Sequence, residues 1–545
     1  MKADLTRDSF LPLKHFSRVL TQQGRVQLDA DSNEQTSILL RYLRALAADV
    51  IGAAGGPKDN LGFAIEALSP APSQTDFQIG FGHYYVDGLL CEADFAPIAF
   101  VPTTTANVYQ VLNWSSDFEL PTVPYYEVFD GAASPAAPAP VAVQITNPNK
   151  GQSQVTFQNA PNLSKFSIPR LRRLITYLHQ PDFVFSNQSG AMSPLPLPAS
   201  ADALQIYLDV WERAVGYAED DSIREVALGG PDTAARTKLV WQVKWQQADR
   251  LTCFAPPTPP PRGWLQAMAK QSSPSTNPCI INPSSSYTGP ENQLYRVEIN
   301  RGGTAGTTPG KSATFKWSRE NGSVIYPIAS GGGTTKVVVE SLGRDDRFGL
   351  SEGDLVEVQD DRTVLLNLPG NLLPVQSIDS TGLTVTLGGT PDATVGGDGS
   401  LHPLLRRWDQ SSGDPAEGGL TLDSDNAAFV QEGVWLTLED GIQIRFQPAD
   451  PSQPANPPVN QYLTSDYWLI PARTATGDVE WPQVTDIHGN PETDSQGNFI
   501  PMALSPHGVS HHYAPLAVVS VKGGTVSLQR DCRNEFAAIA VPVKA

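Results

Sequence analysis

The sequence predicts a mainly β protein of several domains, with short antiparallel strands, a small β-barrel insert and an N-terminal amphipathic helix. Three observations support this fold class. Apolar and polar residues alternate over most of the chain, which is the pattern of half-buried strands. The 45 glycines and 47 prolines recur along the whole chain, as turns between short strands require. Helical spacing is clear in only one stretch, close to the N-terminus.

That stretch reads DADSNEQTSILLRYLRALAADVIGAAGG and begins at residue 29. Ser32 and Gln35 have the spacing of a capping box, which predicts the start of a helix. Gly52 and the glycines after it predict its end. One helical face carries four large apolar residues: Leu39, Leu43, Leu46 and Val50. We expect this stripe to be buried, either on the protein's own β domain or on a neighbouring subunit.

A second, shorter pattern from Pro169 to Gln180 fits a helix, although Thr176 and Tyr177 also suit a strand. Beyond it, period two dominates. Residues 204–210 and 239–245 each place apolar residues on one face. Asn321–Gly322 and Asp440–Gly441 each lie between two alternating arms and predict hairpins. Trp317 and Trp435 are expected to point inward from these strands.

Breaks in composition predict the domain organisation. Residues 131–140 and 255–263 are rich in proline, as in linkers or long loops. Short strands between Gly343 and Gly389 suggest a small self-contained barrel. No repeat of fixed period is evident, which argues against solenoids and propellers. We expect five segments: a helical docking arm (1–56), a β domain with variable loops (57–165), a central β domain (166–342), a barrel-like module (343–400) and a C-terminal β domain (401–545).

The charge of the chain disfavours nucleic acid as a partner. The formal net charge is −19, and no basic stripe interrupts the acidic surface. The N-terminus has acids and no continuous apolar core, unlike a secretory signal. No segment approaches the roughly 20 apolar residues of a membrane helix. We therefore expect folding in the cytoplasm, with any later release as part of an assembly.

The four cysteines, Cys91, Cys253, Cys279 and Cys532, form no CxxC pair, so zinc-ribbon and redox motifs are not indicated. Cys253 and Cys279 flank one proline-rich loop and lie close enough in sequence to pair, which the sequence leaves open. Buried thiols are the simpler expectation.

Residues 305–312, AGTTPGKS, match the end of a phosphate-binding loop. Such a loop needs a helix that starts at the lysine, because the helix amides hold the anion. The residues that follow Lys311 alternate like a strand. A glycine-rich loop with an exposed Lys311 is therefore the better prediction.

No other motif indicates catalysis. Neighbouring acids such as Asp345–Asp346 point to opposite faces of a strand, so such a pair alone is no glycosidase site. Asp29, Asp31 and Asn33 have calcium-loop spacing, but the glycine and the final glutamate of such a loop are missing. His507, His511 and His512 cluster without a nearby acid or cysteine, so whether they bind a metal stays open. We predict no catalytic residue and no cofactor.

Several long blocks resemble an uncharacterised family encoded in gene clusters for phage-tail-like contractile injection systems. The blocks include KHFSRVLTQQGRVQLDADSNEQ, YLDVWERAVGYAEDDSIREVALGGPDTAARTKLVWQV, ENQLYRVEINRGG, ATFKWSRENGSV, DYWLIPARTATG and HHYAPLA. They run from residue 1 to about residue 520 and match least around residues 100–160. The family carries no catalytic residues that could be transferred.

The resemblance implies a non-enzymatic structural subunit at the baseplate, spike cage or fibre-attachment region of a tail-like particle. Its partners would be other baseplate and tail proteins, with several copies around a symmetric tail. Residues 77–94 would form a strand–turn–strand unit of such a subunit. The candidate assembly interface comprises Leu39, Leu43, Leu46, Val50, Arg25 and Asp29. The alternative is a polysaccharide- or cell-surface-binding or cleaving protein associated with such a particle.

Overall fold

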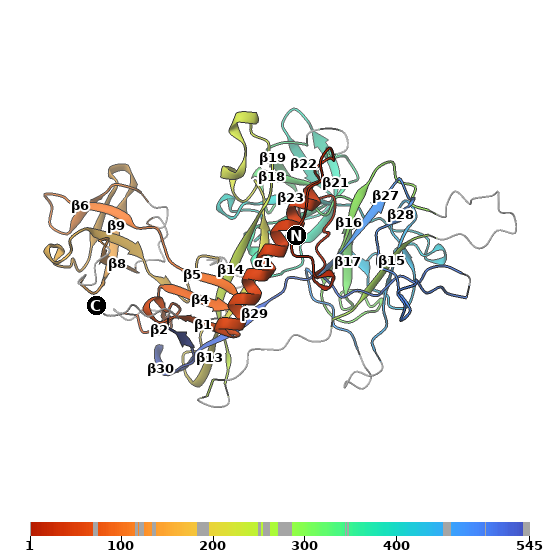
Figure 1. The fold of residues 1–545 in the computed structure, drawn as a ribbon. Coiled ribbons are helices and arrows are strands. Elements are labelled where there is room, and N and C mark those ends of the chain that lie inside the picture. Colours follow the sequence, from red (N-terminus) through yellow and green to blue (C-terminus); the bar gives the residue numbers. More distant parts are fainter. Residues whose placement is uncertain are drawn as a thin grey trace. The chain divides into compact units, whose positions relative to one another are not determined.

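The computed structural model describes residues 2–68, 75–114, 118, 125–132, 138–182, 196–248, 252–253, 262–270, 286–343, 345, 348–450, 459–495 and 497–537. Within them the chain is mainly β, as predicted, with two closed six-stranded barrels, several open sheets and one long N-terminal helix (Figure 1). This helix, α1, spans Asp29–Ile51. No helix of the described residues is long and apolar enough to cross a membrane.

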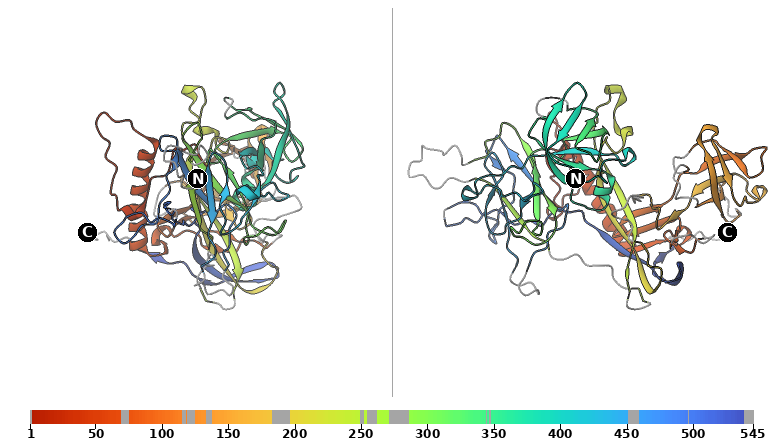
Figure 2. Two further views of the ribbon diagram at one scale, coloured as in Figure 1. Left: turned by 90° about the vertical axis from the view of Figure 1, so that its right-hand side faces the viewer. Right: turned by 180° about the vertical axis from the view of Figure 1, so that it is seen from behind.

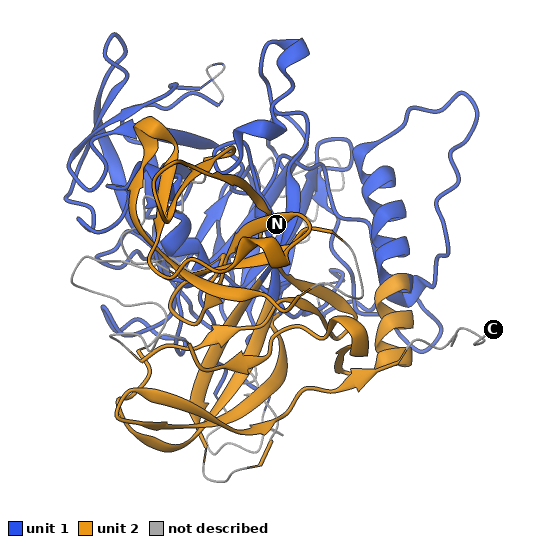
Figure 3. Ribbon diagram, turned by 90° about the vertical axis from the view of Figure 1, so that its left-hand side faces the viewer, with its two compact units in different colours: residues 1–42, 211–240, 258–510 blue, residues 43–210, 241–257, 511–545 orange. Residues whose placement is uncertain are grey.

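The chain forms two compact units, each built from segments that are far apart in sequence (Figure 3). Unit 1 comprises residues 1–42, 211–240 and 258–510, and unit 2 comprises residues 43–210, 241–257 and 511–545. The five segments predicted from the sequence are consecutive and so follow other boundaries. The difference arises because α1 and the long strands β13 (Ala201–Val215) and β14 (Arg236–Gln247) contribute residues to both units.

Unit 1 contains a five-stranded sheet in the order β24-β17-β16-β27-β28 and a three-stranded sheet in the order β15-β26-β25. The strands are β15 (Leu265–Ala269), β16 (Gln293–Arg301), β17 (Thr314–Ser318), β24 (Ala428–Phe429), β25 (Leu436–Thr437), β26 (Ile442–Phe446), β27 (Tyr467–Arg473) and β28 (Asp478–Val479). Trp317, Phe446 and Trp468 lie in their shared core. Trp317 is buried as predicted, whereas Trp435 is half-buried and lies beside the Arg445 guanidinium, 4.7 Å from its ring centroid.

The second part of unit 1 is a closed barrel in the order β18-β19-β22-β21-β20-β23. Its strands are β18 (Ile325–Ser330), β19 (Lys336–Val339), β20 (Leu355–Gln359), β21 (Asn371–Asp379), β22 (Thr384–Leu387) and β23 (Leu404–Trp408). A short helix, α2 (Asp361–Leu365), follows β20. The barrel extends beyond the predicted module of residues 343–400 at both ends, because β18 and β23 pair with each other.

Two predicted hairpins have different outcomes. The Asp440–Gly441 turn joins β25 to β26 as predicted, with Leu436 opposite Ile444. The hairpin at Asn321–Gly322 is wrong, although both residues have positive φ. There β17 pairs with β16 and β24, while β18 pairs with β19 and β23. The turn chemistry fixes the local bend, whereas the partners of the two arms are selected by distant strands.

Unit 2 contains the other barrel, β10-β7-β6-β11-β8-β9, and three open sheets. The barrel strands are β6 (Ile98–Pro102), β7 (Val108–Val111), β8 (Tyr125–Asp130), β9 (Val141–Asn149), β10 (Gln154–Phe157) and β11 (Pro169–Arg173). The sheet strands, besides β13 and β14, are β1 (Ala54–Pro57), β2 (Ile65–Glu66), β3 (Gln78–Ile79), β4 (Gly82–Val86), β5 (Leu89–Ala93), β12 (Ile175–Thr176), β29 (His512–Lys522), β30 (Thr525–Asp531) and β31 (Glu535–Phe536).

Three predictions fall in unit 2. The strand–turn–strand unit within residues 77–94 is confirmed as β4 and β5, joined at Asp87–Gly88. The period-two face of residues 204–210 is confirmed as part of β13, with Leu204, Ile206, Leu208 and Val210 fully buried. The helix from Pro169 to Gln180 is wrong, because β11 pairs with both β6 and β8 in the barrel. The spacing of its apolar residues fits both a helix and a strand, and pairing with the neighbouring strands determines that a strand forms.

Candidate docking surface

The helix α1 starts at Asp29, before the predicted cap at Ser32. The Asp29 carboxylate accepts hydrogen bonds from the backbone nitrogen of Thr6 at 3.1 Å and its hydroxyl at 2.8 Å. Partial burial opposes ionisation, but these hydrogen bonds hold the pKa of Asp29 below its usual value. The predicted capping box is wrong, because Gln35 instead accepts a hydrogen bond from the Val19 nitrogen at 2.8 Å. Gly52 ends the helix as predicted, with a φ of 93°.

The face that α1 turns toward its own chain buries one small and one large apolar side chain. Ala30 and Ile38 are its buried residues. Farther along, the β4–β5 turn lies directly against the helix backbone: a Cβ at Gly88 would come 2.2 Å from the Arg44 carbonyl oxygen. This close approach leaves no room for large side chains between turn and helix.

The predicted stripe therefore lies on the opposite face. Leu39, Leu43, Leu46 and Val50 are exposed, at 53% to 63% of their accessible surface. Of the two possibilities for covering this stripe, packing on the protein's own β domain is wrong. Helical spacing identified a common face but carried no information on the direction in which that face points.

The chain ahead of α1 forms a second exposed apolar surface, residues 10–28, which we term the basic arm. It runs beside the helix as an open arch (Figures 2 and 3). Leu13 and Val26 are 80% and 85% exposed, and Phe16 and Leu20 are also exposed. The arm carries Lys14, Arg18 and Arg25, and no Asp or Glu occurs between Asp8 and Asp29. The side chain of Arg25 is exposed.

The base of the arm is fixed by residues 2–9. The largely buried Lys2 ammonium lies 2.9 Å from Glu298, which also contacts Arg296 and Lys316. Burial lowers the pKa of Lys2 to about 8. Burial opposes the ionisation of Glu298, but the surrounding cations hold its pKa below the usual range.

Two further contacts secure the same segment: Asn321 donates to the Ala3 carbonyl oxygen at 2.8 Å, and Arg7 pairs with Glu480 at 2.8 Å. The arm is thus tethered at this end and, at its other end, by α1.

A third exposed feature is a small projection, residues 483–501, that our sequence prediction missed. The six-residue pattern Thr-Asp-x-x-Gly-Asn occurs twice, at 485–490 and 493–498. Backbone hydrogen bonds form a closed cycle at its base: Val484 donates to Ile500, Ile500 to Glu492 and Glu492 to Val484. The eight-residue spacing was the available signal, but two copies are too few to stand out as a repeat.

The turns of the projection are held by its own aspartates. Asp486 and Asp494 each accept a hydrogen bond from the backbone nitrogen of the asparagine four positions later, at 2.9 Å. Ile487 lies in the first of these turns, at the tip, and is 96% exposed. Phe499, next to Ile500, is half exposed. No Lys or Arg occurs between Arg473 and Lys522, while Glu492 and the two aspartates add negative charge.

The three clustered histidines have separate partners. His507 stacks on Tyr467, with ring centroids 5.5 Å apart. His511 bonds to Asp209 at 2.6 Å, and His512 bonds to Asp87 at 2.9 Å. Across the described ranges, no group of three or more His, Cys, Asp or Glu side chains is placed to hold a metal ion.

The loop at residues 305–312 has the predicted form. Lys311 is exposed in a turn, and strand β17 follows at Thr314. The Gly310 nitrogen donates to the Asp423 carboxylate at 2.9 Å. A loop that already binds a carboxylate, with no helix behind it, lacks the features that hold a nucleotide phosphate.

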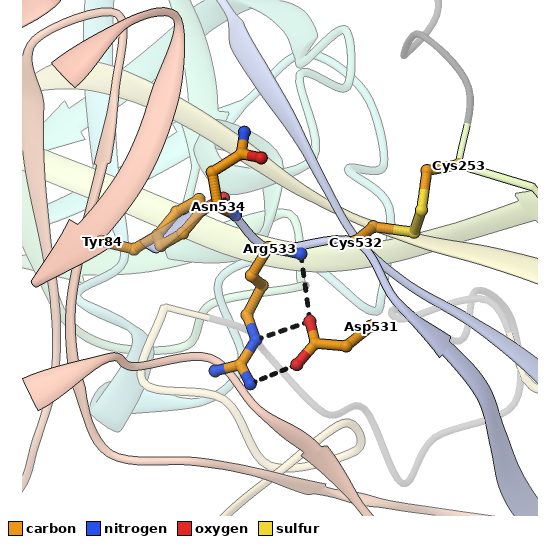
Figure 4. The surroundings of a disulfide bond; sticks show 6 residues. All are labelled: Tyr84, Cys253, Asp531, Cys532, Arg533 and Asn534. Carbon is orange, nitrogen blue, oxygen red and sulfur yellow. Dashed lines mark hydrogen bonds and ion pairs between the residues drawn. A yellow bond between two sulfur atoms is a disulfide. The ribbon is translucent and has the colours of Figure 1, made fainter. Parts of the chain in front are cut away.

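The disulfide joins Cys253 to Cys532, so a Cys253–Cys279 pair is wrong; Cys279 lies outside the described residues (Figure 4). The expectation of buried thiols is wrong for Cys253 and Cys532, because the end of strand β30 brings Cys532 to Cys253. The next residues dock on unit 2: Asn534 donates to the Tyr84 hydroxyl at 3.2 Å, and β31 pairs with β1. Cys91 is a buried free thiol, and burial raises its pKa to about 12.

The profile of a family of unknown function, DUF6519, matches residues 1–133, 192–251 and 260–544. No curated protein matches the chain. No solved structure matches it either.

Proposed function

We propose that this chain, which belongs to the DUF6519 family, is a non-enzymatic structural subunit of a phage-tail-like contractile injection system. Within that particle we place it at the baseplate, spike cage or fibre-attachment region. The assignment to this kind of particle rests on the long sequence blocks described above. Its partners are other baseplate and tail proteins, and several copies surround the tail.

The observation that carries the assembly role is the exposed apolar stripe of α1, which we term the leucine row. The helix buries Ala30 and Ile38 against its own chain and presents Leu39, Leu43, Leu46 and Val50 to solvent. A helix that exposes its large apolar face is a typical docking element. Burying the exposed part of each side chain would contribute about 1 kcal/mol to association. The tethered basic arm is a further exposed apolar surface, and it belongs to unit 1.

A double substitution in the row tests this role. Leu43→Gln with Leu46→Gln removes apolar surface and keeps good helix-forming residues. Val226→Gln with Leu228→Gln is the matched control, since both residues are exposed on a turn elsewhere. Particles purified from cells that express each variant would be analysed for this protein and imaged by electron microscopy.

We expect the α1 variant to fold, by circular dichroism, and to be absent from the particle, while the control is incorporated. Normal incorporation of the α1 variant would refute the docking role. Purified protein that degrades a cell-wall polysaccharide, with particles complete in its absence, would favour the enzymatic alternative.

A further inference from the structure

The basic arm and the acidic projection are complementary surfaces of unit 1. The arm has Lys14, Arg18 and Arg25 and no acid, whereas the projection has Asp486, Glu492 and Asp494 and no Lys or Arg. Each also exposes large apolar side chains, Leu13 on the arm and Ile487 on the projection among them. Opposite charge and shared apolar character are the usual features of two surfaces that bind each other.

The projection is preformed. Its cycle of backbone hydrogen bonds closes the base, and two aspartates hold the turns from within. Turns that are already hydrogen-bonded lose little conformational freedom on binding, which favours affinity. The Glu492 side chain and the Ile487 tip point to solvent and are available to a partner.

The arm is anchored and open. Its base is held by Lys2 and Arg7, and its middle by the hydrogen bond from Val19 to Gln35. Between these points the apolar side chains are uncovered, so within one chain the arm does not cover the projection. A second copy offers the complementary surface that each feature lacks.

The overall charge restricts where two copies can meet. A net charge of −19 makes the general surface repel a second copy. A copy-to-copy contact must therefore use a locally basic surface, and the basic arm lies within a twenty-residue stretch without an acid, from Ser9 to Leu28. Because the two surfaces differ, the contact is head-to-tail, and it closes into a ring when the rotation between copies permits.

We propose that the basic arm of one copy binds the acidic projection of the next, so that copies of this chain assemble head to tail. This inference rests on the proposed structural function and names the partner of the arm. The leucine row of α1 is then available to bind other tail proteins.

A charge exchange between two variants tests the contact. Variant A carries Arg18→Glu with Arg25→Glu, so both of its surfaces are acidic. Variant B carries Ile487→Lys with Glu492→Lys, so two lysines offset Asp486 and Asp494 and its projection carries no net charge. A control carries Val226→Lys with Glu417→Lys. Like variant B, it replaces one exposed apolar residue and one exposed glutamate by lysine, but at positions elsewhere. Sedimentation and light scattering would follow the mass of each sample at low and high salt, with circular dichroism to confirm folding.

We expect wild type and control to associate at low salt and to dissociate as salt screens the contact. Variants A and B should each remain monomeric alone, and an equimolar mixture should associate again. Wild type that stays monomeric at every concentration, or a mixture that stays monomeric, would overturn the proposal. If the α1 variant is still excluded from particles in that case, the structural function stands and only this copy-to-copy contact is lost.

Discussion

Gly88 lies directly against the carbonyl of Arg44, so the β4–β5 turn and α1 meet backbone to backbone. Gly88 also has a φ of 80°, which an L side chain rarely adopts. The contact fixes which side of α1 faces its own chain near Arg44, and the exposed leucines lie on the other side.

We expect Gly88→Ala to lower the free energy of unfolding by about 2–4 kcal/mol, because strain and a steric clash add. Gly523→Ala is the control: this glycine also has positive φ, but no atom lies within 4 Å of the added Cβ. It should cost only about 1 kcal/mol. Denaturant unfolding of both variants measures the difference, and equal losses would mean that the clash at Arg44 is relieved without cost.

The Cys253–Cys532 bond closes a loop across a sequence separation of 279 residues. Reduction, or Cys253→Ser, should lower the free energy of unfolding by about 2–5 kcal/mol, since a long loop gains most entropy when it is opened in the unfolded chain. Calorimetry with and without reductant provides the measurement.

Cys91 provides the reference thiol for that experiment. In a Cys279→Ser background, the folded and oxidised protein should show no reactive thiol at pH 8, because Cys91 is buried and its pKa is about 12. Denaturation should reveal one thiol without reductant and three with it.

For the disulfide itself, a melting temperature that reductant leaves unchanged would show that the Cys253–Cys532 bond does not constrain the fold.

The Lys2–Glu298 pair predicts a pH dependence. The unfolded chain holds the Lys2 proton up to about pH 10.5 and the folded chain only up to about pH 8. Between these values the unfolded state binds more protons, so the contribution of Lys2 to stability rises with pH. Comparing wild type with Lys2→Met by denaturant unfolding across pH 7–11 should show wild type gaining relative to the variant through this window. A constant difference would contradict the lowered pKa.

Removing the acid of that pair should have a larger effect. Glu298→Gln removes the carboxylate that Lys2, Arg296 and Lys316 share. Glu357, which pairs with Lys316, is then the other carboxylate at this site. We expect a loss of about 3–5 kcal/mol, because buried cations without a counter-charge are costly. Faster proteolysis of the basic arm in this variant would show that the pair tethers it; unchanged proteolysis would place the tether elsewhere.

The loop around Lys311 predicts an absence of nucleotide binding. Magnesium ATP should leave the melting temperature of wild type and of Lys311→Ala unchanged, since a strand and not a helix follows Lys311 and the Asp423 carboxylate already binds the Gly310 nitrogen. Micromolar affinity that Lys311→Ala abolishes would show that the loop does hold phosphate.

Local features of the chain were determined by sequence alone. The 3.6-residue spacing before Gly52 predicted α1, and period two predicted the buried face of β13. Asp440–Gly441 predicted a hairpin that the structure contains. These succeed because turn geometry and side-chain direction depend on residues only a few positions apart.

The candidate surface shows what sequence could not provide. The stripe from Leu39 to Val50 was recognised, but its outward direction was decided by the close contact of Gly88 with Arg44. Likewise Asn321–Gly322 fixed a bend, while distant strands placed β17 and β18 in different sheets, and the end of β30 selected Cys532 for Cys253. Periodicity defines a face and a turn defines a bend, but which surface meets that face depends on contacts between residues hundreds of positions apart, which only the tertiary structure supplies.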